Sequence, residues 1–473
     1  MGKSLWSQSV EIAPRERLEK ELRADAVVLG AGMAGVLTAR ALQKRGAKVI
    51  VLEADRIGGG QTKNTTAKLT SQHGMIYDAL IQKFGPEKAG QYARANAEAV
   101  RAMRALLDEL GVDCVDCPAY VYSTVSADPL RREAEAARSL GLDAAFTRDT
   151  ELPFAVKGAA RMAHQARFHP LRLLKAASEG LEIYERSAAL TAEKGLVRTA
   201  QGAVRAEHIV FATHYPFVNA PGWFFLRMHQ ERSYVLALES EWLPEGMYIG
   251  ADADGLSLRE ADGLLLAGGE AHRTGENSAG GRYERLLERT RAFAGKERAR
   301  WSAQDCVTVD GVPYIGLFAE ENGWYVATGF GKWGMSSSMA SALLLSGQIA
   351  GGAPDWTEVF APMRFQLSAS AKSAATELTQ ACKGLARGFF AFPRALLDEL
   401  PRGHGGIVEA EGRKAGVYKD ENGECHFVDP RCPHLGCQVE WNPDERSWDC
   451  PCHGSRFRFN GALIDNPAQE GLQ

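Results

Sequence analysis

The 473-residue sequence lacks the features of a membrane, secreted or nucleic-acid-binding protein. It has no run of 18 apolar residues, and its N-terminus has no apolar stretch before a small-residue cleavage site. A formal net charge of -4 gives neither nucleic acid nor an anionic membrane an electrostatic attraction. We therefore expect a cytoplasmic chain without a transmembrane segment, whose partners are small molecules and redox proteins.

Cysteine is sparse except near the C-terminus, where four of the nine cysteines lie between residues 432 and 452. This distribution is typical of a metal site and not of a secreted disulfide scaffold. Cys114 and Cys117 form a C-x-x-C pair, but Pro118 follows instead of the start of a helix, so we predict structural thiols. The remaining cysteines are predicted to be buried or incidental: Cys306, Cys382 and Cys425.

The chain is too long for a single core, and its pattern changes twice. An apolar run at 26–29, a glycine turn, a helical stretch and the strand KVIVLEA form a βαβ unit. Strand signals stop after residue 365, and 366–400 reads as a helical connector with a break at Pro393. Short alternating strands over 401–473 then predict a small all-β domain.

The βαβ unit carries a dinucleotide-binding fingerprint. Gly30, Gly32 and Gly35 spell G-x-G-x-x-G between strand and helix, and Glu53 ends the second strand. The glycines allow the tight turn, the close approach of pyrophosphate and the packing of the helix, while the carboxylate accepts ribose hydroxyls. NAD and FAD both fit this fingerprint.

The glycine motif and three further segments together favour one of these cofactors. GAGMAG, the glycine run 58–60, the strand IVFATHYP and the block DGVPYIG followed by WYVATGFGKWGMSSS resemble the D-amino-acid oxidase family of flavoenzymes. The resemblance covers residues 24–365 and implies bound FAD and oxidation of a carbon–nitrogen bond. It also implies further cofactor-binding residues: Gly60, Thr62, Ala212, Gly329, Gly331, Gly334 and Met335.

The expected fold class is an α/β FAD-binding Rossmann-like domain with an inserted α+β substrate domain, followed by an all-β domain. Within residues 1–365, the predicted FAD-binding segments are 22–78, 155–214 and 305–365. The predicted substrate domain comprises 79–154 and 215–304.

Two alternatives concern the cofactor. Gly329, Gly331 and Gly334 repeat the glycine spacing, but Asp355 has no apolar strand ahead of it, so a separate NAD(P)H site is disfavoured. We interpret this turn as one that directs a helix N-terminus at the flavin. Covalent attachment is also disfavoured because the late block has no cysteine, and His73 is the remaining alternative.

Positioning residues for a substrate follow from the family pattern: His214, Arg232, Tyr234, Tyr248, Arg259 and Lys332. Arg232 or Arg259 is a candidate for binding a substrate carboxylate through two parallel hydrogen bonds. Lys332 is a candidate for stabilising the negative charge of reduced flavin. Surface charge and sheet packing are the alternative roles of these side chains. Ser336 stands where sarcosine oxidase-like enzymes have a lysine, so their substrate does not transfer to this chain.

Near the C-terminus, Cys432-x-His434 and Cys450-x-x-His453 each offer one thiolate and one imidazole. Structural zinc sites usually pair like ligands, as C-x-x-C with H-x-x-x-H. The interleaved pattern instead favours a [2Fe-2S] cluster with two cysteines on one iron and two histidines on the other.

CPHLGC and CPCHGS resemble the Rieske proteins over residues 401–473. The resemblance implies four cluster ligands: Cys432, His434, Cys450 and His453. It also implies a disulfide between Cys437 and Cys452. Ser455 offers one hydrogen bond to the cluster, but Phe457 stands where high-potential relatives carry tyrosine, so we expect an intermediate potential within about -150 to +300 mV.

The two ends together predict an electron relay. An amine or amino acid would reduce FAD, and the cluster would pass the electrons singly to an external acceptor protein or quinone. In one alternative the protein is a reductase, and electrons pass inward from a reduced carrier through the cluster to FAD, which reduces a substrate. Another is a flavin and iron–sulfur redox sensor without turnover.

Overall fold

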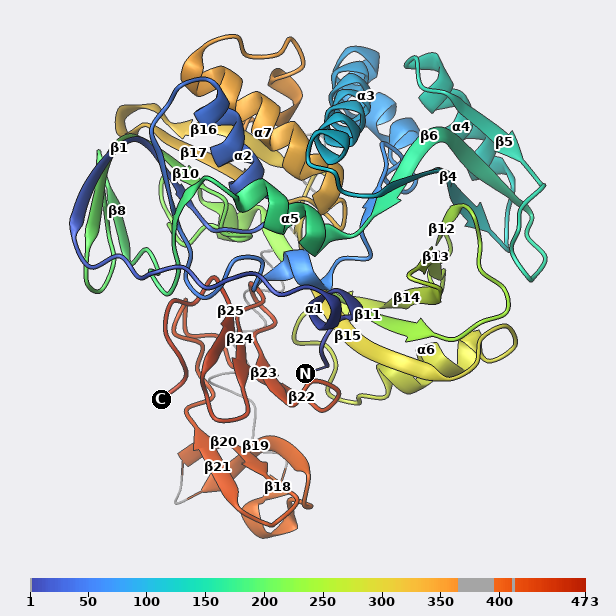
Figure 1. Cartoon of the computed structure of the whole chain (residues 1–473). Coiled ribbons are helices and arrows are strands. Elements are labelled where there is room, and N and C mark those ends of the chain that lie inside the picture. Colours follow the sequence, from blue (N-terminus) through green and yellow to red (C-terminus); the bar gives the residue numbers. More distant parts are fainter. Residues whose placement is uncertain (1, 365–394, 411–412) are drawn as a thin grey trace.

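The computed structural model describes residues 2–364, 395–410 and 413–473 of the chain. Figure 1 shows a large body, with the C-terminal residues as a lobe along one side of it. The predicted connector at 366–400 falls largely on residues 365–394, which lie outside the described residues, as do Cys382 and Pro393. Its last part forms the strand β18 (Ala395–Leu396) and the 3-10 turn η5 (Leu397–Glu399).

The first sheet of the large body has eight strands and holds the N-terminal glycine motif. Its main order is β16-β17-β10-β1-β2-β7, with β9 attached to β10 and β8 to β9. β1 pairs in parallel with β10 on one side and with β2 on the other. The strands are β1 (Glu21–Leu29), β2 (Val49–Leu52), β7 (Glu182–Tyr184), β8 (Thr191–Glu193), β9 (Leu196–Arg198), β10 (Ala203–Phe211), β16 (Tyr314–Ala319) and β17 (Trp324–Thr328).

The central strands of this sheet are buried on both faces. Ala26 and Val28 belong to the apolar cluster that includes α2 (Met33–Lys44) and α7 (Gly334–Ala350), whereas Val27 and Leu29 belong to a cluster on the opposite face. Alternate side chains of a strand point to opposite faces, so a continuous apolar run suits a sheet that is covered twice. Figure 1 shows α2, α7 and α5 (Pro170–Ser178) on the same side of the sheet.

The second sheet has nine strands in the order β15-β11-β14-β13-β12-β4-β6-β3, and β5 also pairs with β6. Although β3 and β13 are far apart in this order, Lys68 Nζ on β3 lies 2.5 Å from Ser257 Oγ on β13. The sheet therefore curves strongly around its inner face. The strands are β3 (Lys68–Leu69), β4 (Cys114–Ser123), β5 (Ala144–Thr147), β6 (Gly158–Phe168), β11 (Met228–Leu238), β12 (Met247–Gly250), β13 (Ser257–Ala261), β14 (Leu264–Arg273) and β15 (Glu297–Thr308).

The longest helix of the described chain, α3, bends at Gly85, which has φ +81° and precedes Pro86. Among the described residues, no helix combines the length and the apolarity needed to cross a bilayer. The other helical elements are α1 (Leu5–Ser9), η1 (Gln61–Asn64), α3 (Tyr77–Glu109), α4 (Asp128–Ser139), η2 (Phe224–Leu226), α6 (Arg282–Thr290), η3 (Glu320–Asn322) and η4 (Glu358–Phe360).

The two sheets divide the chain differently from the predicted segments. β3 falls in the predicted FAD-binding segment 22–78 and β6 in 155–214, yet both strands belong to the second sheet. The reason is their pairing, because β6 runs antiparallel to β4 over its whole length and β3 adds to its other edge.

The C-terminal residues form two four-stranded sheets. One contains β18, β19 (His404–Ala410), β20 (Arg413–Lys419) and β21 (Cys425–Val428), and the other β22 (Glu440–Asn442), β23 (Ser447–Asp449), β24 (Arg456–Arg458) and β25 (Leu463–Asp465). In Figure 1 the sheet β22–β25 lies against the large body, and β18–β21 lies farther out. The predicted fold class, an α/β domain with an inserted α+β domain and a terminal all-β domain, is confirmed.

Candidate functional site: a dinucleotide cavity beside a cysteine–histidine cluster

The turn between β1 and α2 tolerates only glycine at two positions. Gly30 has φ +102°, and a Cβ on it would lie 2.5 Å from the carbonyl oxygen of Ala212. A Cβ on Gly35 would lie 1.9 Å from the carbonyl oxygen of Gly30, so the helix could not pack this closely against the turn. The N-terminus of α2 consequently lies next to the end of β1, where backbone N–H groups can bind phosphate.

Glu53 follows β2 and is fixed by two backbone hydrogen bonds. Its Oε2 accepts from the amide of Ala31 at 2.7 Å, and its Oε1 accepts from the amide of Asp55 at 2.8 Å. Burial raises the pKa of Glu53, while the hydrogen bonds from these two amides oppose that rise. The carboxylate thus stands next to the glycine turn, as the dinucleotide fingerprint requires.

The glycine turn opens into a cavity of about 650 Å³ that extends to the inner face of the second sheet. Nearly all predicted cofactor residues line it: Gly30, Gly32, Glu53, Gly60, Thr62, Ala212, Gly329, Gly334 and Met335. Gly35 and Gly331 are not among the lining residues. Gly35 serves the packing of α2 on the turn, and Gly331 lines a smaller neighbouring hollow.

Three of the six predicted substrate residues line the cavity: His214, Tyr234 and Lys332. Burial lowers the pKa of His214, and Asp465 and Gln230 oppose that shift. The Tyr234 hydroxyl accepts a hydrogen bond from Asn277 Nδ2 at 3.1 Å, and burial raises its pKa to about 12. Lys332 Nζ forms an ion pair with Glu231 at 2.7 Å, so its charge is already balanced.

The other three predicted substrate residues are held elsewhere. Arg232 is buried and pairs with Glu445 at 2.9 Å. The Tyr248 hydroxyl lies 2.9 Å from a carboxylate oxygen of Glu151. Arg259 donates to the carbonyl oxygens of Ala67 and Glu260. None of the three lines the cavity. The side chains of both arginines are thus occupied in interactions within the chain.

The ionisable groups that line the cavity and that sequence reasoning missed include Lys68 and Asp305. Burial raises the pKa of Asp305 to about 6, although the nearby Lys332 ammonium opposes this rise. Burial lowers the pKa of Lys68 to about 7, and the Arg259 guanidinium adds to the shift. The sequence offers only a weak signal for Lys68. It is a charged residue in a short strand that follows the glycine run.

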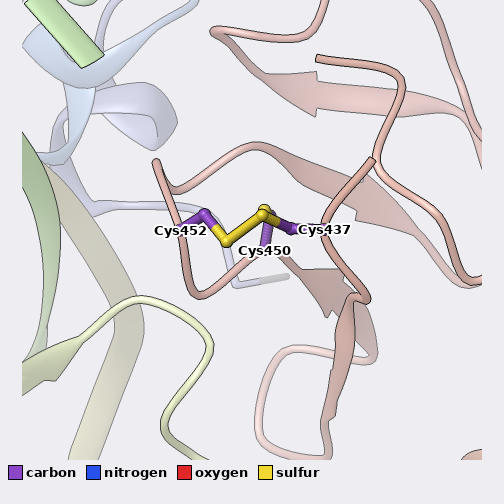
Figure 2. A group of neighbouring side chains, drawn as sticks. All are labelled: Cys437, Cys450 and Cys452. Carbon is purple, nitrogen blue, oxygen red and sulfur yellow. A yellow bond between two sulfur atoms is a disulfide. The ribbon is translucent and has the colours of Figure 1, made fainter. Parts of the chain in front are cut away.

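The second site is built from two loops of the C-terminal domain. Cys432 and His434 lie between β21 and β22, and Cys450 and His453 lie between β23 and β24. The loops are joined by a disulfide between Cys437 and Cys452, which agrees with the pairing that the Rieske resemblance implies. Figure 2 shows this disulfide beside Cys450, whose thiol is free.

The four expected ligands form two close pairs, one of thiols and one of imidazoles. The Cys432 and Cys450 thiols are both buried and unbridged, and a hydrogen bond from Cys450 lowers the pKa of Cys432. The rings of His434 and His453 lie 4.9 Å apart. Nδ1 of His434 is buried without a hydrogen-bond partner, while its Nε2 contacts Asn219 Oδ1 at 3.1 Å. Two thiols, two imidazoles and an available ring nitrogen fit a [2Fe-2S] cluster.

One cluster loop contacts strands β11 and β15, other residues of which line the dinucleotide cavity. Gln230 Nε2 donates to the carbonyl oxygens of His453 at 2.8 Å and Asn466 at 3.0 Å. Gln304 Nε2 donates to Gly454 O at 2.8 Å and to Gln230 Oε1 at 2.7 Å. Both glutamines are buried, and Asn466 lines the cavity itself. A cluster loop and the cavity therefore share one wall.

The N-terminal C-x-x-C pair lacks the lowered thiol pKa of a redox-active pair. Cys114 and Cys117 lie on β4 as free thiols, and burial raises the pKa of Cys117 to about 11. A protonated thiol is a poor nucleophile and redox group, which is consistent with the predicted structural role.

Family models match both parts of the chain. The model for FAD dependent oxidoreductases (DAO) matches residues 25–348, and the model for the Rieske [2Fe-2S] domain matches residues 392–473. A protein of Bacillus subtilis (strain 168), named YhfW and described as a Rieske 2Fe-2S iron-sulfur protein, is 37% identical over 490 residues, with 99% of this chain and 96% of the relative covered. The menaquinol:cytochrome c reductase iron-sulfur subunit of Geobacillus thermodenitrificans is 44% identical over 57 residues, which cover 11% of this chain and 34% of the relative.

Solved structures share the fold of the large body. Glycine oxidase from Geobacillus kaustophilus aligns with a TM-score of 0.62 at 20% identity, covering 73% of this chain and 100% of that structure. L-proline dehydrogenase from P. horikoshii aligns with a TM-score of 0.62 at 18% identity, covering 75% of this chain and 98% of that structure.

Proposed function

Because the chain belongs to the FAD dependent oxidoreductase family and carries a Rieske [2Fe-2S] domain, we propose that it is a dehydrogenase for a carbon–nitrogen bond of an amine or amino acid. In this proposal the electrons leave FAD through the Rieske cluster. They then pass to an external one-electron acceptor, either a protein or a quinone.

The residues of the chain have separate tasks in this proposal. FAD supplies the acceptor for a hydride, and the cluster supplies a one-electron carrier. The glycine turn and the N-terminus of α2 hold the pyrophosphate, and Glu53 binds the ribose. The cavity residues His214 and Tyr234 position the substrate and restrict the entry of water.

The shared wall between cavity and cluster loop is the observation that carries the proposal. Gln230 and Gln304 connect strands β11 and β15 to the main chain of His453 and Gly454 through buried hydrogen bonds. Electron transfer between two centres needs a short path through packed atoms. A cluster loop attached to the cavity wall satisfies this need, whereas a loop at the far side of the molecule would not.

Anaerobic reduction tests the proposal. The purified protein is mixed with amines and amino acids, starting with glycine and L-proline because two structural neighbours are named for these compounds. We expect one compound to bleach the flavin absorbance and then to produce the electron paramagnetic resonance (EPR) signal of the reduced cluster. A Cys450→Ser variant, which removes one ligand, should still bleach its flavin but show no cluster signal.

Two results would contradict the relay. Flavin reduction with stoichiometric peroxide in air, and with no reduction of the cluster, would indicate an oxidase. Failure of every amine and amino acid to bleach the flavin would instead favour inward electron flow or a sensor. Reducing the cluster chemically and following the flavin absorbance separates those two cases, because only inward flow reduces flavin that way.

A further inference from the structure

Lys68 has an unusual environment for a lysine. Its side chain lines the cavity, although the residue is only 8% exposed. Nζ contacts Ser257 Oγ at 2.5 Å and Thr66 Oγ1 at 3.4 Å. Both partners are hydroxyls, which hydrogen-bond to an amine but do not balance the charge of an ammonium group.

The charged neighbour of Lys68 disfavours a positive charge there. The Arg259 guanidinium on β13 lowers the pKa of Lys68 beyond the effect of burial, whereas the Cys117 thiol on β4 opposes this shift. Arg167, which faces Lys68 in the register of β3 and β6, is paired with Glu260 at 2.8 Å. In the described part of the chain, no carboxylate forms an ion pair with either Lys68 or Arg259. Burial without a counter-ion next to a second cation favours the neutral amine.

From this geometry we infer that Lys68 is the proton acceptor for the substrate ammonium group. The inference rests on the proposed function, because it gives Lys68 a task in the oxidation of an amine. An N–H bond of the ammonium group breaks, an N–H bond to Lys68 Nζ forms, and no oxidation state changes in this step. The substrate nitrogen regains the lone pair that it needs before a hydride can leave the neighbouring carbon.

Ser257 and Arg259 assist this role in different ways. Ser257 Oγ fixes the position of Nζ at the cavity surface. Arg259 lies behind Lys68 and does not line the cavity, so it acts on the amine through its charge and not by contact with a substrate. This assignment replaces the predicted carboxylate binding by Arg259 with a positioning role.

The first experiment measures the state of the amine without turnover. The holoprotein is labelled briefly with acetic anhydride between pH 5 and pH 11, and modification of the Lys68 peptide is measured by mass spectrometry. We expect labelling to rise with a midpoint near pH 7, because the pKa of Lys68 is lowered to about 7. Labelling that begins only above pH 9 would overturn the inference, even if no amine has yet been found to reduce the flavin.

The second experiment separates proton transfer from anion binding. Lys68→Met and Lys68→Arg are compared with Lys63→Met, a control on η1 that does not line the cavity. With glycine or L-proline under anaerobic conditions, we expect the limiting rate of flavin reduction to fall about 100-fold in both Lys68 variants. The wild-type rate should fall as the pH drops through 7, and this inflection should disappear in Lys68→Met.

Three outcomes would contradict the assignment. A normal rate in Lys68→Arg would mean that only a positive charge is needed, as for a group that binds a carboxylate. An inflection that persists in Lys68→Met but disappears in Asp305→Asn would make Asp305 the acceptor. A rate unchanged in both Lys68 variants would exclude Lys68 from the reaction, whereas a failed screen of all amines would count against the proposed function alone.

Discussion

Phe457 is fully buried on β24, opposite Trp448 on β23, in the sheet that carries the second cluster loop. Its ring has no hydrogen-bond donor. Ser455, two residues earlier, is also buried, and its hydroxyl contributes to the lowered pKa of Cys432. A single substitution at either of these two positions therefore adds or removes a hydroxyl donor near the cluster.

A Phe457→Tyr substitution should raise the reduction potential of the cluster, because a new donor stabilises the more negative reduced state. One hydrogen bond of about 1.4 kcal/mol corresponds to about 60 mV for a one-electron couple. The potential is measured by a titration followed by EPR. Ser455→Ala should shift it in the opposite direction, and an unchanged potential in Phe457→Tyr would contradict the hydrogen-bond argument.

Gly35 provides a second prediction at the residue scale. Because a Cβ at this position would lie 1.9 Å from Gly30 O, Gly35→Ala must displace α2 from the turn. We expect the purified variant to lose most of its FAD, measured by flavin absorbance per protein. Gly90→Ala, within α3, is the matched control, since its Cβ would meet only the Arg94 side chain at 3.5 Å and FAD should remain bound.

At the scale of elements, strands β11 and β15 position the cluster loop. Gln230 and Gln304 on these strands make three buried hydrogen bonds, to His453 O, to Gly454 O and to each other. A Cβ on Gly454 would lie 2.6 Å from the Gln230 side chain, so the loop approaches these strands as closely as a glycine allows. The paired strands β11 and β15 therefore also fix the position of the loop between β23 and β24.

Replacing Gln230 with leucine should slow electron transfer to the cluster without changing the rate of flavin reduction. The substitution leaves the carbonyl oxygens of His453 and Asn466 without this donor, at a cost of about 1–3 kcal/mol each. Stopped-flow absorbance separates the two phases. Gln43→Leu, whose hydrogen bond to Gly180 O is exposed, should leave both phases unchanged; equal slowing of both phases in Gln230→Leu would indicate general damage.

At the scale of the whole molecule, a buried ionic group joins the C-terminal domain to the large body. Glu445, in the turn between β22 and β23, accepts from Arg232 at 2.9 Å, Ser302 at 2.5 Å and Tyr283 at 2.8 Å. Arg456 of its own domain lies 3.4 Å away. This arrangement explains why Arg232 is unavailable to a substrate.

Glu445→Leu should destabilise the protein by about 3–5 kcal/mol, because two buried guanidinium groups lose their shared carboxylate. The free energy of unfolding is measured with urea. Glu421→Ala, which breaks the exposed pair with Arg446, should cost about 1 kcal/mol or less. If both substitutions cost the same, the buried group does not fasten the two domains.

Much of the protein could be predicted from short sequence patterns. The βαβ unit, the glycine turn and the two cysteine–histidine loops depend on residues close together in the chain, so their spacing alone reveals them. The family resemblances added FAD and the [2Fe-2S] cluster, and both agree with the family models. The fold class followed from the same local patterns.

Tertiary structure decided which distant side chains meet. The sequence makes Arg232 and Arg259 equal candidates for binding a substrate carboxylate. In the structure Arg232 pairs with Glu445, whereas the charge of Arg259 lowers the pKa of Lys68. Lys68 acquires its shifted pKa only because the second sheet curves until β3 reaches β13. Local spacing therefore determined the cofactor sites, whereas long-range strand pairing and burial determined the charges of the substrate cavity and its contact with the cluster domain.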